Sequence, residues 1–178
     1  DPGGMETRAR RDGTSWVLSG TKRWITNGSI ADVAIVWAKD GDTIRGFLLE
    51  PGMSGYSAHD IKGKFSLRAS ITSELVLDEV RVPATNQLPG AEGLGGPFSC
   101  LNQARFGIVW GALGAARTCY QTALAYAQAR RQFDRPLAGF QLVQQKLVHM
   151  LTEITKGQLL AWRLGRLKDA GAMRPEQV

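Results

Sequence analysis

Residues 88–115, LPGAEGLGGPFSCLNQARFGIVWGALGA, divide the chain into two parts with different hydrophobic periodicity. Upstream, from Ser15 to about Val82, short runs rich in β-branched and aromatic residues alternate with Gly, Asp and Pro, which is typical of strands and turns. Downstream, apolar residues recur at helical spacing. The glycine-rich stretch from Leu88 through Gly96 is therefore the expected loop that closes a β part and precedes a helical part.

Five upstream segments are expected to form strands, and no segment of helix length separates them. This order disfavours alternating βαβ units and predicts an antiparallel sandwich or barrel. The arginines at positions 8, 10 and 11, ahead of Asp12-Gly13, are expected in a solvated hairpin turn. The predicted strands cover residues 15–26 (SWVLSGTKRWIT), 32–39 (DVAIVWAK), 43–51 (TIRGFLLEP), 56–61 (YSAHDI) and 72–82 (TSELVLDEVRV).

Two long helices are predicted downstream, over Pro97–Gln132 and Phe140–Lys168, and a short connection between antiparallel helices suggests the beginning of a four-helix bundle. The first helix carries a stripe of small residues that includes Gly107, Gly111 and Gly114. Each mid-helix glycine costs about 1 kcal/mol relative to alanine, which close packing against another helix or a ligand would explain. The expected fold class is α+β, with a β domain over residues 1–93 and a helical domain over 94–178.

The composition is that of a globular chain, and no run approaches the ~18 consecutive apolar residues of a membrane span. No charged and apolar leader opens the sequence, so an intracellular compartment is expected.

Cys100 and Cys119 have neither CxxC spacing nor a neighbouring histidine, and buried free thiols are the interpretation. His59 and His149 each stand alone, so no metal site is expected.

The net charge is +6 and the sequence pI is about 9.7, which suits either a nucleic acid or a ligand with several phosphates. The arginines are scattered, so a nucleotide cofactor or coenzyme A is favoured and no nucleic-acid partner is expected. The chain begins at Asp1 without a methionine, and Pro175-Glu176 would open a helix just before the chain ends. A longer polypeptide is the expectation.

The first candidate site is Trp24-Ile25-Thr26, at the end of a predicted strand and ahead of Asn27-Gly28. An indole offers a flat face for stacking on a heterocycle, and a hydroxyl two residues later on a regular strand points to the same side. The structural alternative is a tryptophan that covers a sheet edge. Spacing alone favours that alternative slightly.

The second candidate site lies in the first turns of the long helix. Helix N-termini favour anionic ligands, and Asn102 and Arg105 share a face on which they could bond to each other. Capping and solvent exposure explain the same residues without a ligand. The candidate residues are Phe98, Ser99, Cys100, Leu101, Asn102, Gln103, Ala104 and Arg105.

The third candidate site is the connection RRQFDRPLAGFQ, residues 130–141, which has more polar and aromatic residues than a linker needs. Arg130 could contact phosphate through two N–H groups, Phe133 and Phe140 could cover a purine, and Gln141 could bond to its edge or to a ribose. A linker with solvated arginines is the alternative. GxGxxG after a strand, a Walker loop and GxSxG are all missing, so a Rossmann site, a P-loop and a serine hydrolase lose their usual signals.

These three stretches, in this order and spacing, resemble the acyl-CoA dehydrogenase family. WITN, NQAR and RxQFxxPL are shared with the wider family, while KFSLRAS and LGGPF resemble its glutaryl-CoA branch. The resemblance covers nearly the whole chain. It implies a middle β domain followed by the first two helices of a C-terminal four-helix bundle.

The resemblance also implies an FAD cofactor. Trp24, Ile25 and Thr26 would contact the flavin ring, and the stretch 98–105 would line the acyl-CoA site. Residues of the connection would hold the adenosine diphosphate half of the FAD in a neighbouring subunit, so a homo-oligomer is implied, commonly a dimer of dimers. Those residues are Arg130, Gln132, Phe133 and Gln141.

The reaction implied for the glutaryl branch is dehydrogenation of glutaryl-CoA with loss of CO2, giving crotonyl-CoA and passing electrons to an electron-transfer flavoprotein. The family's catalytic glutamate is expected beyond Val178, or in a minority at the position just before Arg105, which here is Ala104. No catalytic residue is therefore predicted within this chain, and the chain alone is expected to be inactive. The compartment would be the cytoplasm of a bacterium or the mitochondrial matrix of a eukaryote.

Three alternatives stay open at this point: a dehydrogenase for another short acyl chain, an acyl-CoA oxidase, and a flavin-binding or interaction module without catalysis. Asp134 stands where the family usually has glycine. If the backbone there has a positive φ, aspartate can adopt it at modest cost, and its carboxylate is expected to point to solvent.

Overall fold

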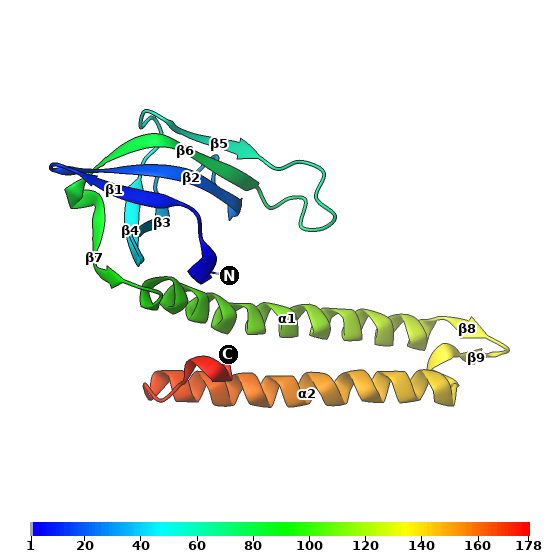
Figure 1. Cartoon of the computed structure of the whole chain (residues 1–178). Coiled ribbons are helices and arrows are strands. Elements are labelled where there is room, and N and C mark those ends of the chain that lie inside the picture. The colour runs from blue at the N-terminus through cyan, green and yellow to red at the C-terminus, as the bar shows by residue number, and fades with distance from the viewer. Residues whose placement is uncertain (1) are drawn as a thin grey trace. The chain divides into compact units, whose positions relative to one another are not determined.

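The computed structural model describes residues 2–178. The chain forms two compact units, Asp1–Ser99 and Cys100–Val178, and each is described by itself. The first unit contains the strands β1 to β7, and the second contains most of a long helix, a short β-hairpin and all of another long helix (Figure 1). Short 3₁₀ helices lie at η1 Pro2–Gly4, η2 Ala84–Asn86, η3 Leu137–Gly139 and η4 Pro175–Gln177.

The β unit is a seven-stranded sheet with the order β5-β6-β2-β1-β3-β4-β7. Neighbouring strands pair antiparallel, except for a short parallel contact between β1 and β3. The antiparallel β fold and the two long helices that follow it are therefore confirmed. The strands are β1 Arg8–Asp12, β2 Ser15–Thr26, β3 Ala34–Asp40, β4 Thr43–Leu49, β5 Tyr56–Asp60, β6 Thr72–Pro83 and β7 Gln87–Glu92.

Two strands were not predicted from the sequence. The arginine-rich run forms β1, so the hairpin turn lies after it, at Gly13, and only Ala9 is buried within the run. The presumed loop after Asn86 contains β7, an edge strand that pairs with β4. Pro89 cannot donate a ladder hydrogen bond, which an edge position tolerates.

The curved sheet encloses a single hydrophobic core. Leu18 on β2, Val80 on β6, and Val36 and Phe47 on the other half of the sheet belong to one cluster, and each is at most 1% exposed. The Trp16 ring meets the Phe47 ring edge to face at 5.4 Å between centroids, which links the two halves. The core therefore fixes the path of β2, which carries the first candidate site at its C-terminal end.

The pairing of β2 with β6 contains two irregularities. Between Leu18 and Gly20, β6 has one residue more than β2, and Glu79 there has a φ of 51°. Between Lys22 and Ile25, β2 has the extra residue, and Trp24 has a φ of 62°. Each irregularity is a β-bulge, which locally disrupts the ladder and bends the strand.

The helical unit pairs α1 (Gly95–Ala129) with α2 (Gln141–Asp169), which run antiparallel (Figure 1). Leu113 packs over Gly157, and the Trp110 ring lies beside Gly165. At the other end of the contact, the Lys168 ammonium lies 4.6 Å from the Phe106 ring centroid. The small residues that allow close approach of the helices are thus on α2.

The glycine stripe of α1 does not make this contact. A Cβ added at Gly107, Gly111 or Gly114 would meet nothing within 4 Å in the described chain, so packing of that stripe against α2 is not observed. Cys100 and Cys119 are exposed, which makes the expectation of buried thiols wrong. A pair of helices covers fewer faces than a full bundle, and large apolar side chains such as Ile108 (72% exposed) also remain uncovered.

Candidate functional site

Trp24 occupies an unusual backbone position at the second bulge. Its φ of 62° lies in the left-handed region, where a bulky side chain is strained, and its side chain is 60% exposed. The Arg23 guanidinium lies 5.6 Å from the indole centroid. The prediction that Trp24 and Thr26 share one side rested on regular alternation, and the bulge between Lys22 and Ile25 interrupts that alternation.

A pocket of about 260 Å³ lies beside Thr26. Lys22 and Gly28 also line it, together with apolar side chains of β2, β3 and β6. Burial lowers the pKa of the Lys22 ammonium, whose contact in the structure is the Met5 sulfur at 4.0 Å. The pocket therefore offers an exposed hydroxyl and a poorly compensated cation to a polar ligand.

The connection between α1 and α2 is a β-hairpin. The first helix ends at Ala129, three residues before the predicted end, and β8 (Arg131–Gln132) pairs with β9 (Arg135–Pro136). Phe133 and Asp134 form the two-residue turn with φ values of 52° and 59°. Two consecutive positive φ values characterise the type I′ turn, which usually contains Asn-Gly, and this is why the sequence did not reveal the hairpin.

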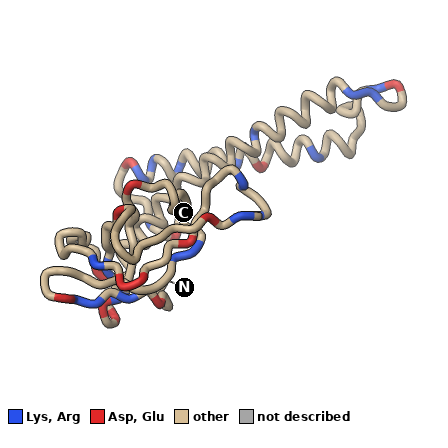
Figure 2. Tube along the Cα trace, turned by 90° about the horizontal axis from the view of Figure 1, so that it is seen from above, with Lys and Arg blue, Asp and Glu red and all other residues tan. Residues whose placement is uncertain are grey.

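The hairpin carries charges of both signs (Figure 2). Both of its closing bonds are accepted by main-chain carbonyls. The Leu137 N–H donates to the Arg130 carbonyl at 2.8 Å. The Arg131 guanidinium donates to the Asp134 carbonyl. Asp134 itself is exposed, in agreement with the expected solvent-facing carboxylate. The hairpin is thereby held without help from a ligand.

The Phe133 ring of the turn, the Phe140 ring and the Arg135 guanidinium form a cluster. The Phe133 and Phe140 rings meet edge to face with centroids 6.4 Å apart, and the Arg135 guanidinium lies 3.8 Å from the Phe140 centroid. Phe140, Gln141 and Arg135 line a groove of about 540 Å³. Phe133 is 88% exposed. The structure thus brings Phe140 and Gln141 together at one groove, whereas Arg130 and Gln132 are exposed outside its lining.

The first turns of α1 present a mainly exposed face. Phe98 is 43% exposed and Leu101 41% exposed, while Asn102 is half-buried. Within residues 2–178 no hydrogen bond joins Asn102 to Arg105, so the expected pairing is not made. Gln103 instead accepts a hydrogen bond from Lys168 of α2. Within residues 2–178, Arg105 forms no ion pair with an aspartate or glutamate side chain.

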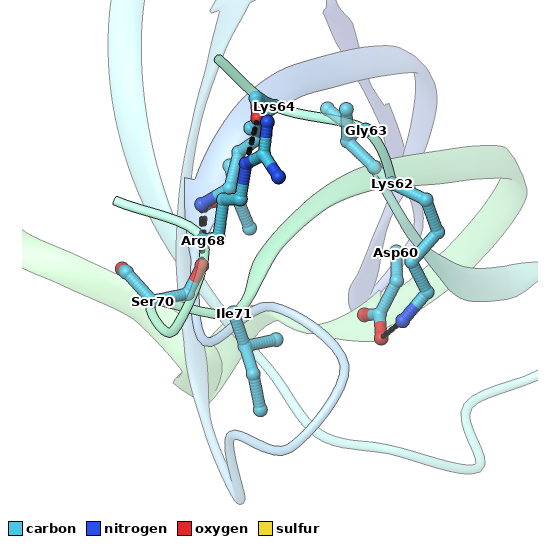
Figure 3. A pocket seen from close by; sticks show the side chains of 9 residues that line it. Asp60, Lys62, Gly63, Lys64, Arg68, Ser70 and Ile71 are labelled. Atoms are coloured by element: carbon cyan, nitrogen blue, oxygen red, sulfur yellow. Dashed lines mark hydrogen bonds and ion pairs between the residues drawn. The ribbon is translucent and has the colours of Figure 1, made fainter. Parts of the chain in front are cut away.

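A cationic pocket of about 290 Å³ lies in the loop between β5 and β6 (Figure 3). The Lys64 ammonium bonds to the Ser70 carbonyl and, at 2.7 Å, to the Thr72 hydroxyl, while Arg68 Nε donates to the Lys64 carbonyl at 3.0 Å. Lys62 pairs with Asp60 at 2.9 Å. This pocket was not predicted from the sequence, although three cations within seven residues were an available signal.

No group of three His, Cys, Asp or Glu side chains within residues 2–178 is placed to hold a metal ion. None of the helices in that range is long and apolar enough to cross a membrane.

Comparison with known proteins gives two family models that together cover most of the chain. The model for the middle domain of acyl-CoA dehydrogenase matches residues 1–80, and the model for the C-terminal domain of acyl-CoA dehydrogenase matches residues 91–178. The mitochondrial short-chain specific acyl-CoA dehydrogenase of Rattus norvegicus is 36% identical over 176 residues. That alignment covers 95% of this chain and 42% of the rat protein.

Solved structures give a closer match. Glutaryl-CoA dehydrogenase from Mycobacterium smegmatis superposes with a TM-score of 0.97 at 63% identity, covering 99% of this chain and 46% of that one. A second structure from the same organism, in complex with FADH2, is 62% identical with the same TM-score and the same coverage. This chain therefore spans less than half the length of these relatives. With both domain models matched in order and the fold reproduced, the chain belongs to the acyl-CoA dehydrogenase family.

Proposed function

We propose that this chain contributes the middle domain and the first part of the helical bundle to an FAD-dependent glutaryl-CoA dehydrogenase. The domains would cover residues 1–93 and 94–178. The observation that carries the proposal is that Trp24 and Phe133, two of the predicted cofactor contacts, are exposed aromatic residues held in the left-handed backbone region. Strain of this kind costs of order 1–3 kcal/mol per residue and clusters at ligand sites.

The residues at the end of β2 fit the flavin end of FAD. The exposed indole of Trp24 offers a stacking face, Ile25 would add apolar contact, and the Thr26 hydroxyl can bond to the polar edge of the ring system. The desolvated Lys22 ammonium in the pocket beside Thr26 would favour negative charge on a bound ligand. When bound, FAD would accept the hydride from the β-carbon of the acyl chain.

The hairpin fits the adenosine diphosphate end of a second copy's FAD. Phe133 and Gln141 would contact the adenine, Arg130 the pyrophosphate, and Gln132 would add an amide. The groove beside Phe140 and Gln141 supports a ligand at this position. An FAD site completed by two chains requires at least a dimer, and we propose a dimer of dimers.

The acyl-CoA would lie along the first turns of α1, with Phe98, Leu101 and Arg105 among its contacts. Ala104 has no proton acceptor, so the base that removes the α-proton would come from outside this chain. Loss of the γ-carboxylate as CO2 would then give crotonyl-CoA, and the electrons would leave to an electron-transfer flavoprotein. We expect the isolated chain to have no dehydrogenase activity. The enzyme would be located in the cytoplasm of a bacterium or in the mitochondrial matrix of a eukaryote.

A hybrid enzyme tests this proposal. The matching segment of the Mycobacterium smegmatis glutaryl-CoA dehydrogenase is replaced by this chain, which is feasible at 63% identity over 99% of the chain. We expect the hybrid to copurify with FAD, to bleach on addition of glutaryl-CoA and to release CO2. A hybrid that folds but binds no FAD would refute the proposed function, and turnover by the isolated chain would refute its inactivity.

Assays of the same hybrid enzyme distinguish the proposed function from three alternatives. The 36% identity to a short-chain acyl-CoA dehydrogenase favours that enzyme as the second candidate, which would oxidise butyryl-CoA without releasing CO2. An acyl-CoA oxidase would consume oxygen directly. A flavin-binding module without catalysis would retain FAD but leave it oxidised with every acyl-CoA offered.

A further inference from the structure

The turn that follows Thr26 is fastened to the sheet at three points. The Asn27 N–H donates to the Ile71 carbonyl at 2.9 Å, and the Ser29 N–H donates to the Ser73 hydroxyl at 3.1 Å. The Ser29 hydroxyl donates to the Asp60 carboxylate at 2.6 Å. A loop with main-chain and side-chain anchors on two other segments has little freedom to move, so these bonds add to the pairing of Thr26 with Thr72 in holding the end of β2.

Ser73 is the buried link in this arrangement. It is 0% exposed, and its hydroxyl accepts from the Ser29 N–H while donating to Asp60 Oδ1 at 3.2 Å. One O–H donor and one acceptor lone pair are thus both used. Removing the hydroxyl would leave the Ser29 N–H without its protein acceptor and Asp60 without one donor.

The ionisation state of Asp60 determines which groups donate and which accept in this set of hydrogen bonds. The Ser29 hydroxyl, followed by Lys62, lowers the pKa of the Asp60 carboxyl to about 2. The group is therefore a carboxylate near neutral pH and can only accept. Ser29, Ser73 and Lys62 must all donate to it, so each of these side chains is restricted to one orientation.

The packing leaves no room for the turn to shift toward the sheet. A Cβ at Gly28 would lie 2.8 Å from Leu75 Cδ2 and 2.9 Å from Ser73 Cβ, so the backbone rests directly on β6. Asn27 adopts a φ of 58°, which asparagine tolerates better than most residues. The close contact with β6 and the hydrogen bonds described above together fix the height of the turn above the sheet.

We infer that Asp60 and Ser73 are positioning residues for the flavin site: they hold the 27–29 turn so that Thr26 and Trp24 are presented before the cofactor binds. This inference rests on the proposed function. The platform is preorganised by a buried hydroxyl and a carboxylate that do not touch the flavin, and binding does not have to order it.

The first experiment measures amide hydrogen exchange of residues 27–29 in the 178-residue chain without cofactor. Ser73→Ala and Ser29→Ala are expected to speed this exchange about fivefold, in line with the roughly 1 kcal/mol of an average hydrogen bond. Ser29→Thr keeps a hydroxyl and restores the slow exchange. Ser54→Ala, an exposed serine before β5, is the matched control and leaves it unchanged. Unchanged exchange in both Ser73→Ala and Ser29→Ala overturns the inference.

The second experiment measures FAD in the hybrid enzyme. Ser29→Ala and Asp60→Asn are expected to raise the Kd for FAD about three- to tenfold, the effect of one modest hydrogen bond, and to shift the visible flavin absorption band. Ser29→Thr restores both. If the unsubstituted hybrid binds FAD and the variants match it in Kd and spectrum, the positioning role fails while the proposed function stands. If the unsubstituted hybrid binds no FAD, both fail.

Discussion

Leu113 of α1 packs so closely over Gly157 of α2 that a Cβ on Gly157 would lie 2.6 Å from Leu113 Cδ2. Gly111, on the same helix as Leu113, would meet nothing within 4 Å. We therefore expect Gly111→Ala to stabilise the helical unit by about 1 kcal/mol through helix propensity alone. The melting temperature, followed by circular dichroism, should rise by roughly 4–8 °C for a unit of this size.

The matched variant is Gly157→Ala. It gains the same propensity but must displace the Leu113 side chain, so its net stabilisation should be smaller than that of Gly111→Ala or absent. Equal gains at both positions would show that the two helices do not approach in solution as they do in the structure.

Acid should weaken the β unit through Asp60. The folded-state pKa of its carboxyl is about 2, below the ordinary value of 3.8, so the ionised form stabilises the fold. Because the folded pKa lies below the unfolded one, this stabilisation is complete above about pH 4 and is lost as the pH falls toward 2. Asp60→Asn should lower the urea midpoint near neutral pH, and its difference from the parent chain should shrink between pH 4 and pH 2.

Asp42, an exposed aspartate in the turn between β3 and β4, supplies the control. Asp42→Asn should follow the parent curve at every pH. A difference between Asp60→Asn and the parent that is constant across this range would assign the effect to packing and not to ionisation.

Replacing Lys22 by an uncharged side chain should stabilise the β unit. Burial lowers the pKa of this ammonium, so folding carries the cost of a desolvated charge at neutral pH. We expect Lys22→Met to gain about 0.5–1 kcal/mol, typical of a stabilising single substitution. Because the folded pKa is lowered, the cost is present at neutral pH and disappears as the pH rises toward 10.5, the ordinary pKa of a lysine. Urea unfolding at pH 7 and pH 10.5 measures the change, and an equal gain at both would contradict the explanation.

Phe133 should be replaceable with a gain in stability and a loss in cofactor affinity. Its φ of 52° is available to glycine without the roughly 1–2 kcal/mol that an L-residue loses in this region. Phe133→Gly should therefore raise the melting temperature of the helical unit, while FAD binding by the hybrid weakens because the exposed ring is gone. Asp134→Gly should change both quantities less, and an FAD affinity much tighter than that of the parent would show that the carboxylate faces the ligand.

The sequence predicted the strands that combine apolar alternation with clear turn residues, and β2 was placed with both ends correct at Ser15 and Thr26. It did not predict β1, because a five-residue strand with Ala9 as its buried residue has no alternation to detect. It did not predict β7 because Pro89-Gly90 reads as a turn. These two short strands bury few side chains in the core, so they lack the apolar alternation that predicts a strand. They form because a neighbouring strand offers hydrogen-bond partners, which hydrophobic periodicity does not reveal.

The candidate site was predicted in residue type more than in geometry. Trp24, Thr26 and Phe133 were identified by what their side chains can contact, but the positive φ values of Trp24 and Phe133 follow from a bulge and a type I′ turn, which neither residue favours. Burial of Cys100 was inferred from statistics for complete domains. This chain covers 46% of the matching solved structure, and the helix faces that carry Cys100 and Cys119 are exposed.

The two bulges between β2 and β6 have opposite effects on strand phase. The extra residue at Glu79 moves the pairing out of step, and the extra residue near Trp24 brings it back, so that Ile25 and Thr26 regain the register set at Ser15. Deleting either residue alone would exchange inward and outward side chains over part of the ladder. Deleting both would leave a continuous, regular ladder with no exposed left-handed tryptophan. The β-bulge at Trp24 is thus compensated by a second β-bulge on the neighbouring strand, and the two together preserve the register of the ladder.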